Sequence, residues 1–197
     1  MGLLRACADA VLVGAGTLRA TPGHRWTAEH IFPDLAAEFG QLRRNLGRTA
    51  EPRLVLLTAS GDIDLSHPAV AAGATVLTTT ARASSLEGRL PAGCDVIAAG
   101  DGSSVDLTQA LAELRRRGHD AVLTEGGPHV MGELIDRRLL DEAFVTVSPL
   151  LAGRGSERRL GMIAGLELLP SRGEWTKLVT ARRHGDFLFL RYRLRPA

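Results

Sequence analysis

Residues 8–20 read ADAVLVGAGTLRA, in which an apolar run ends at a glycine. Val11, Leu12 and Val13 have the side chains of a short strand that is buried on both faces, predicted over residues 9–13. Gly14-Ala15-Gly16-Thr17 is then expected to form a loop at the carboxyl end of that strand. Strands buried on both faces belong mostly to parallel sheets covered by helices. This stretch therefore favours an α/β fold.

The remainder of the chain alternates apolar strands with amphipathic helices. Strands are predicted at residues 54–58, 74–79, 95–99, 121–124 and 143–148. Helices are predicted at residues 35–46, at 107–117 behind the capping pair Asp106 and Gln109, and from Pro128 to about residue 138. Segments 179–183 and 187–194 predict a hairpin. This order predicts a single domain over residues 1–197, with a mostly parallel sheet, helices on both faces and an antiparallel C-terminal hairpin.

Composition and charge exclude several classes of function. The 197 residues carry 24 basic and 22 acidic side chains, and the resulting net charge of +2 does not favour a nucleic-acid partner. No run approaches the roughly 18 apolar residues of a membrane span. Cys7 and Cys94 form no metal or disulfide pattern, and the six histidines show no ligand spacing. We therefore expect a cytoplasmic protein without a metal site.

Two glycine segments follow predicted strands, where ligands of open α/β sheets bind. Gly14-Ala15-Gly16-Thr17 allows close approach of a ligand to the backbone, and Glu125-Gly126-Gly127-Pro128 exposes N–H groups such as those of His129 and Val130. Together they suggest the diphosphate of a nucleotide. Neither segment is a complete dinucleotide or P-loop motif, and glycine after a strand also serves simple turns. Likewise, the Glu125 carboxylate has either a substrate role or a contact with its helix terminus.

Three strings taken together resemble a known family. They are ADAVLVGAGTLRA at residues 8–20, LTEGGPHVMGELIDRRLLDE at 123–142 and VSPLLAGRG at 147–155. In this order and spacing they resemble the reductase domain of the bifunctional riboflavin-biosynthesis deaminase-reductase. The resemblance implies a dihydrofolate-reductase-like fold, a homodimer, and NADPH-dependent reduction of 5-amino-6-(5-phosphoribosylamino)uracil at the ribose C1′. The chain carries no zinc-deaminase motif, so only the reduction is implied.

The resemblance also assigns roles to residues near the predicted strand ends. Glu125 matches a position that contacts the substrate, where it would orient the polyol or stabilise a developing iminium. Arg19 and Arg25 are the cationic candidates for the substrate phosphate. By similarity, Gly16 and Thr17 would touch the cofactor, residues 58–60 would lie near its adenosine 2′-phosphate, and residues 127–133 would hold its diphosphate and nicotinamide side. Together with the two glycine segments, this gives the expected cofactor contacts: Gly14, Ala15, Gly16, Thr17, Thr58, Ser60, Gly126, Gly127, Pro128, His129 and Val130.

The chain departs from the family pattern in its first residues and after the first glycine segment. The family begins with a further strand and helix before Ala8, whereas here Met1 enters partway through that helix. Because the absent strand is interior in this fold, we expect a misplaced start codon, another chain that fills the gap, or an impaired protein. Thr21 stands where the family usually has an acid, and residues 27–47 look like an inserted loop and helix.

Three functions remain open on this sequence. The first is the pyrimidine reductase of riboflavin synthesis. The second is a paralogous reductase that acts on dihydrofolate or another heterocycle on the same scaffold. The third is a noncatalytic nucleotide-binding or partner-binding protein, suggested by the absent strand. Turnover of the pyrimidine substrate separates the first function from the other two.

Overall fold

The computed structural model describes residues 1–153, 161–170 and 172–194. The chain divides into two compact units, residues 1–127 and residues 128–197, and each unit contains one sheet. Two residues of the third string quoted above, 154 and 155, lie outside the described residues. No helix in the described part of the chain is long and apolar enough to cross a lipid bilayer.

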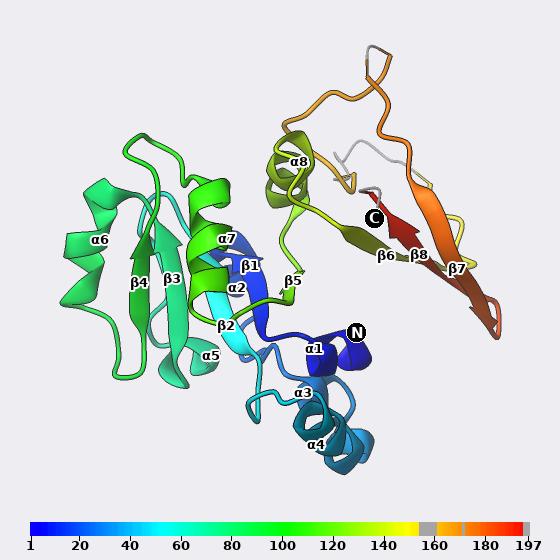
Figure 1. The fold of residues 1–197 in the computed structure, drawn as a ribbon, viewed down its shortest axis with the longest axis horizontal. Coiled ribbons are helices and arrows are strands. Elements are labelled where there is room, and N and C mark those ends of the chain that lie inside the picture. Colours follow the sequence, from blue (N-terminus) through cyan, green and yellow to red (C-terminus); the bar gives the residue numbers. More distant parts are fainter. Residues whose placement is uncertain (154–160, 171, 195–197) are drawn as a thin grey trace. The chain divides into compact units, whose positions relative to one another are not determined.

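The first unit is built on a parallel sheet of five strands. These are β1 (Ala10–Gly14), β2 (Arg53–Leu57), β3 (Ala74–Thr78), β4 (Asp95–Ala98) and β5 (Val122–Thr124). Their order in the sheet is β4-β3-β2-β1-β5 (Figure 1). In the register, Val11 lies opposite Leu54, and Leu12 lies opposite Thr124. The predicted α/β class with a mostly parallel sheet is confirmed.

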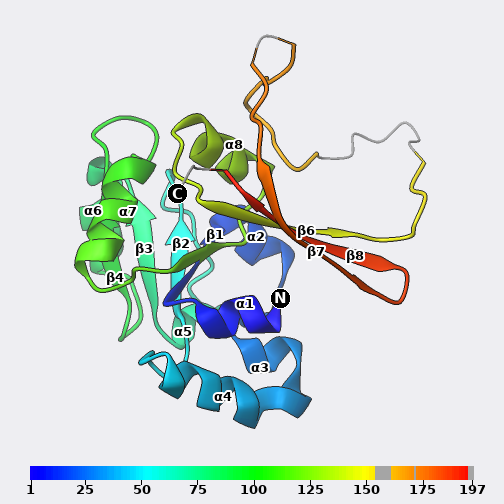
Figure 2. The same ribbon diagram turned by 45° about the vertical axis from the view of Figure 1, so that its right-hand side comes forward.

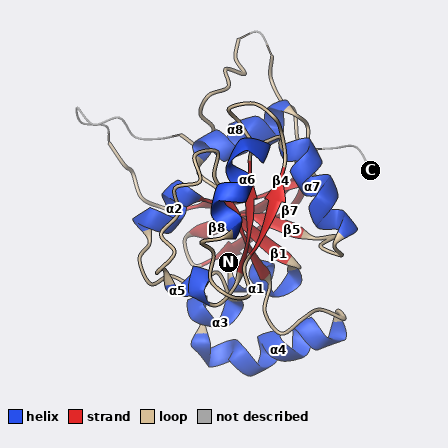
Figure 3. Cartoon of the chain, turned by 90° about the vertical axis from the view of Figure 1, so that its left-hand side faces the viewer, coloured by secondary structure: helices blue, strands red, loops and turns tan. Residues whose placement is uncertain are grey.

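Strand β1 is buried on both faces of this sheet, as its sequence predicts. Val11 and Val13 belong to a core cluster that also contains Trp26 and Leu86. Leu12 points to the opposite face, because side chains alternate along a strand, and it is 1% exposed. Figure 3 shows α7 (Leu107–Arg116) on one side of these strands and α2 (Ala15–Ala20) and α5 (Pro68–Ala71) on the other. Helices therefore cover both faces.

Parallel strands need crossover connections, and short helices provide them. They are α2 (Ala15–Ala20), α5 (Pro68–Ala71), α6 (Thr80–Glu87) and α7 (Leu107–Arg116). Asp106 caps α7 as predicted, because its carboxylate accepts the N–H groups of Thr108 and Gln109. The sequence did not reveal α5 or α6, since the first is four residues long and the second is rich in small polar residues.

The predicted loop at residues 14–17 is wrong. Gly14 is the last residue of β1, and Ala15, Gly16 and Thr17 form the first turn of α2. The strand therefore passes into a helix without an intervening loop. Glycine often signals a turn, but neither the φ of Gly14 (−80°) nor that of Gly16 lies in the left-handed region, so both conformations are compatible with a strand that passes into a helix.

A small helical group contains the first helix and the segment expected as an insertion. It consists of α1 (Gly2–Cys7), α3 (Ala28–Ile31), the 3-10 turn η1 (Pro33–Leu35) and α4 (Ala36–Asn45). Ala6, Ala28 and Phe39 form its buried cluster, with Leu42 packed against it. Leu35 and Leu46, predicted on the same apolar face, are 39% and 47% exposed. Figures 1 and 2 both show α1, α3 and α4 together below the tails of the strand arrows.

The second unit contains one helix and an antiparallel sheet. Its elements are α8 (Pro128–Asp136), β6 (Glu142–Val147), β7 (Lys177–His184) and β8 (Phe187–Arg193). The predicted hairpin is confirmed as β7 and β8. Strand β6 pairs with β8, so that the order is β6-β8-β7 and the antiparallel strands form a sheet of their own. The register places apolar Val145 opposite Leu190, which explains this pairing.

Candidate functional site

The first glycine segment and Glu125 lie at the same edge of the parallel sheet. Leu12 of β1 pairs with Thr124 of β5, so Gly14 and Gly126 each follow a paired residue by two positions. The Glu125 backbone N–H donates to the Leu12 carbonyl at 2.9 Å, and the Gly126 N–H donates to Thr124 Oγ1 at 3.2 Å. The two strand ends therefore meet at the carboxyl edge of the sheet, where ligands of such folds bind.

Two glycines at this edge have open space where a side chain would be. A Cβ added to Gly16 or to Gly127 would meet no atom within 4 Å, and neither residue has a positive φ. Neither the packing nor the backbone conformation of the described residues therefore requires glycine at these positions. Such surroundings fit the close approach of an extended ligand such as a dinucleotide to the main chain.

The hydroxyl residues after β2 shape their own turn. Thr58 is 5% exposed, and its Oγ1 accepts the Gly61 N–H at 3.1 Å. Ser60 is exposed, and its Oγ accepts the Asp62 N–H at 3.2 Å. Of the two residues predicted near a cofactor phosphate, Ser60 has the more accessible hydroxyl, whereas that of Thr58 is buried in the turn.

The start of α8 is held by a later segment of its own unit. Pro128 is the first helical residue, as predicted, and its carbonyl accepts the Ala164 N–H at 3.0 Å. A Cβ added to Gly132 would lie 2.3 Å from the Ala164 carbonyl oxygen, so this helix approaches its neighbour closely. His129 is exposed and Val130 is half-buried.

Glu125 is paired with a buried arginine that lies 120 residues earlier in the chain. Arg5 Nε donates to Glu125 Oε1 and Arg5 Nη2 donates to Oε2, each at 2.7 Å. The side chain of Arg5 is 2% exposed and that of Glu125 is 15% exposed. This two-point geometry is the strongest form of an arginine–carboxylate contact. It fixes the plane of the carboxylate and leaves only one part of Glu125 accessible.

His24 completes the surroundings of this pair. Its Nε2 lies 3.1 Å from Arg5 Nη2. A guanidinium only donates, so His24 Nε2 accepts and the imidazole is neutral with its proton on Nδ1. Burial lowers the pKa of His24, and the positive charge of Arg5 lowers it further. Rings of Trp26 and His30 stand edge-on to it, with centroids 4.9 and 4.6 Å away.

The two arginines predicted for the substrate phosphate each have an acidic partner. Arg19 Nη1 lies 3.3 Å from Asp62 Oδ2, and Arg25 Nη2 lies 3.0 Å from Glu51 Oε2. Both pairs are exposed, so either can exchange its carboxylate for a phosphate at little cost. Only Arg25 is connected to Glu125, because its backbone carbonyl accepts an N–H of Arg5.

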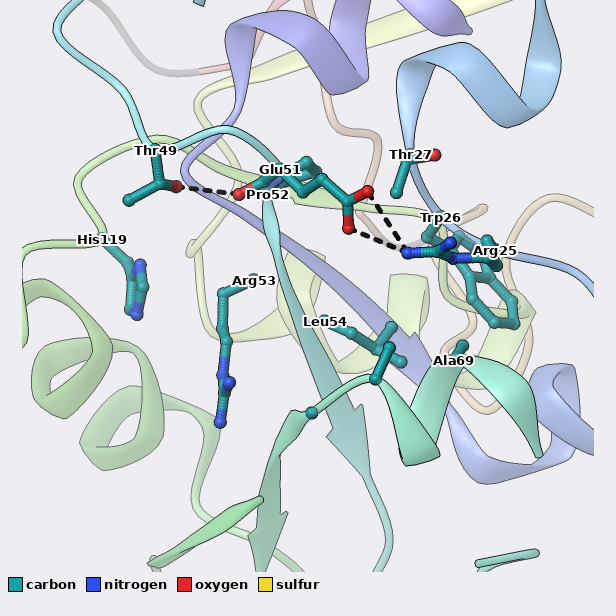
Figure 4. A pocket seen from close by; sticks show the side chains of 12 residues that line it. Arg25, Trp26, Thr27, Thr49, Glu51, Pro52, Arg53, Leu54, Ala69 and His119 are labelled. Atoms are coloured by element: carbon teal, nitrogen blue, oxygen red, sulfur yellow. Dashed lines mark hydrogen bonds and ion pairs between the residues drawn. The ribbon is translucent and has the colours of Figure 1, made fainter. Parts of the chain in front are cut away.

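A pocket of about 260 Å³ lies away from the predicted cofactor edge (Figure 4). Its lining includes Glu51 and Pro52, which precede β2, Arg53, the first residue of β2, and His119, which precedes β5. These residues mark the amino ends of the strands. Ligands of open α/β sheets bind at the opposite ends, so we do not assign the predicted site to this pocket. Arg25 is the one predicted site residue among its lining residues.

Sequence reasoning missed Arg5 and His24. Arg5 is the single charged residue in the first helix, and charged residues are seldom fully buried unless they are paired. No local sequence pattern indicates an ion-pair partner 120 residues later in the chain. Among the described residues, no group of three or more His, Cys, Asp or Glu side chains is arranged to hold a metal ion.

Comparison with known proteins gives one curated relative. It is the 2,5-diamino-6-ribosylamino-4(3H)-pyrimidinone 5′-phosphate reductase of Aquifex aeolicus, 28% identical over 152 residues. The alignment covers 76% of this chain and 61% of the relative. The chain thus spans about three-fifths of the length of that protein.

Solved structures match the fold at low sequence identity. A pyrimidine reductase-like protein of Corynebacterium diphtheriae has a TM-score of 0.74 at 22% identity, over all of this chain and 79% of that one. RibD of Acinetobacter baumannii has a TM-score of 0.73 at 19% identity, over 98% of this chain and 48% of that one. The profile of the RibD C-terminal domain family matches residues 1–171. This match confirms the resemblance found in the three strings, and the chain belongs to the RibD C-terminal domain family.

Proposed function

We propose that this chain reduces a phosphoribosylaminopyrimidine of riboflavin biosynthesis with NADPH, converting the ribose to ribityl. The observation that carries the proposal is the family match over residues 1–171, which includes the glycine segments and Glu125. The match also spans the boundary between the two units. We therefore propose that residues 1–197 act as one reductase domain.

The open surroundings of Gly16 and Gly127 support a dinucleotide at the carboxyl edge of the sheet. Gly14 to Thr17 and Gly126 to Val130 would hold the diphosphate and nicotinamide side through main-chain N–H groups. Ser60, with Thr58 shaping its turn, would lie near the adenosine 2′-phosphate. When bound, NADPH would supply the hydride for a new C–H bond at the ribose C1′. The bond between C1′ and the ring oxygen would break, and that oxygen would take a proton to become a hydroxyl.

Glu125 would bind the substrate as a hydrogen-bond acceptor. Both of its oxygens already accept from Arg5, and each retains a further lone pair. The charges of Arg5 and Glu125 cancel each other. The Glu125 carboxylate would therefore attract a positively charged iminium of the substrate only weakly. Of the two roles that the sequence left open, orientation of the ribose hydroxyls is therefore favoured.

The test is a comparison of substrates with the wild-type protein. We expect loss of NADPH absorbance with 5-amino-6-(5-phosphoribosylamino)uracil or with the 2,5-diamino pyrimidinone named for the Aquifex aeolicus relative. The two differ at the pyrimidine C2 substituent, so their kcat/KM ratio identifies the preferred one. Dihydrofolate and NADH serve as the comparison substrate and cofactor. Turnover of dihydrofolate alone favours the paralogous reductase, and saturable NADPH binding without any turnover favours a noncatalytic binding protein.

We further propose that the chain forms a homodimer through its antiparallel sheet. Phe144 of β6 and Phe187 and Phe189 of β8 are exposed, and the strand register places them on one face of the sheet. Exposed apolar patches of this kind often mark protein interfaces. We expect light scattering to report twice the chain mass and Phe189→Glu to reduce it.

We also propose that the protein works in the cytoplasm. A reducing compartment is consistent with the free cysteines Cys7 and Cys94 and with the proposed use of NADPH.

A further inference from the structure

Arg5 uses all five of its guanidinium N–H groups. Three of them meet the side chains of Glu125 and His24, as described above. The other two, on Nη1, donate to the backbone carbonyls of Arg25 at 3.1 Å and Thr27 at 3.2 Å. An arginine has five donors in a rigid planar fork and no other residue can match that number. Arg5 therefore has no N–H left to bind a substrate directly.

The cost of burying this side chain argues against a role in stability alone. Arg5 as a whole is 1% exposed. Buried ion pairs contribute little net stability, because the loss of hydration offsets the attraction, and apolar replacements are often as stable. What the pair does achieve is a fixed orientation of Glu125, whose side chain remains 15% exposed at the end of β5.

We propose that Arg5 is a positioning residue for the reduction: it holds the Glu125 carboxylate and the backbone of residues 24–27 in one arrangement. This inference rests on the proposed function. Glu125 is the candidate for the ribose end of the substrate. One guanidinium joins the Glu125 carboxylate to the backbone of the loop at residues 24–27, so Arg5 fixes the position of Glu125 relative to that loop.

Arg5→Lys is the variant that separates positioning from charge. A lysine keeps the positive charge but has three donors on a single atom, so it cannot hold both carboxylate oxygens and both carbonyls. Small displacements of a positioned group reduce rates by about 100-fold. We expect kcat to fall by about 10- to 100-fold, with the NADPH dissociation constant within about twofold of wild type.

Arg191→Lys is the matched control. Arg191 makes the same two-point contact with Glu142, at 2.8 and 2.6 Å, on a sheet that carries none of the candidate site residues. We expect wild-type kcat for this variant. An Arg5→Lys kcat within twofold of wild type overturns the inference while the proposed function stands. A wild-type protein that turns over neither pyrimidine overturns the proposed function and this inference with it.

A double-mutant cycle tests whether Arg5 acts through Glu125. If it does, adding Arg5→Lys to Glu125→Gln causes little further loss, because the group that Arg5 orients has already been changed. Losses that multiply show that Arg5 acts independently of Glu125 and contradict the proposal. Circular dichroism and thermal melting of each variant identify a loss that comes from unfolding. If kcat, NADPH affinity and melting temperature all fall in Arg5→Lys, the role of Arg5 is structural. That result also contradicts the positioning proposal.

Discussion

Arg43 donates from Nη1 to the backbone carbonyl of Arg5 at 3.1 Å. The two N–H groups of this Nη1 are shared with the carbonyls of Ala6 at 3.1 Å and Ala8 at 2.8 Å. Nε donates to the backbone carbonyl of Thr49 at 2.7 Å. Carbonyls at a helix C-terminus lack the N–H groups of a following turn, and Arg43 donates to them. The Arg5 carbonyl also accepts the N–H of Ala8 at 3.2 Å. Helix α4, in the segment that looks like an insertion, thus fixes the end of α1 and the backbone of the residue that orients Glu125.

We expect Arg43→Met to destabilise the protein by about 3 kcal/mol, because it leaves buried carbonyls without a donor. Arg43 is 2% exposed. Chemical denaturation measures the loss, and Arg44→Met is the control, since Arg44 is an exposed neighbour on the same helix whose side chain bonds Gln41. Equal denaturation midpoints for the two variants would contradict the bracing role of Arg43.

Replacement of Glu125 is expected to affect stability as well as turnover. Glu125→Ala leaves the charge of Arg5 buried and unpaired, which costs about 3 kcal/mol. Glu125→Gln keeps one acceptor for Arg5 and should lose less. The control is Glu142→Ala, whose pair with Arg191 is more exposed and is expected to contribute less than about 1 kcal/mol. A Glu125→Ala protein as stable as wild type would mean that Arg5 finds other acceptors.

The sequence predicted the elements that local chemistry specifies. The apolar run of β1, the cap of α7 by Asp106 and the hairpin of β7 and β8 each depend on residues close together in the chain. Because parallel strands align their carboxyl ends, the sequence also placed Gly14 and Glu125 at one edge. The predicted position of the site at the carboxyl edge follows from the order of the strands alone.

The sequence could not show which charges pair across the fold. Arg5 finds Glu125 through tertiary packing, and Arg19 and Arg25 find Asp62 and Glu51 in the same way. The error at residues 14–17 has a similar origin. Glycine signals a turn locally, but the chain after β1 continues directly into α2.

Adding a methyl group at the open glycines is expected to separate cofactor binding from folding. A Cβ at Gly16 or Gly127 meets no protein atom within 4 Å, so neither alanine should destabilise the fold. Gly16→Ala should stabilise α2 by up to about 1 kcal/mol, because alanine favours helix. If NADPH lies against these residues, its dissociation constant should rise about tenfold, which corresponds to about 1.4 kcal/mol.

Fluorescence titration with NADPH measures this change, and Gly88→Ala is its control. Gly88 ends α6 with a φ of −76°, and a Cβ there also meets nothing within 4 Å. The control should bind NADPH as wild type does. Unchanged affinity in both Gly16→Ala and Gly127→Ala would place the cofactor elsewhere.

His24 should make the folded state less stable as the pH falls below about 6.5. Burial lowers the pKa of His24 in the folded protein, and the charges of Arg5, His30 and His67 lower it further, although Glu125 opposes them. The unfolded chain therefore binds a proton at a pH where the folded chain does not, so stability present above that pH is lost below it. Protonated His24 would also lose the lone pair that accepts from Arg5.

Denaturation midpoints between about pH 7.5 and pH 5.5 measure the slope of stability against pH. In His24→Gln the amide oxygen can still accept from Arg5 but does not titrate, so the slope should flatten. An identical slope in the two proteins would assign the pH dependence to other groups.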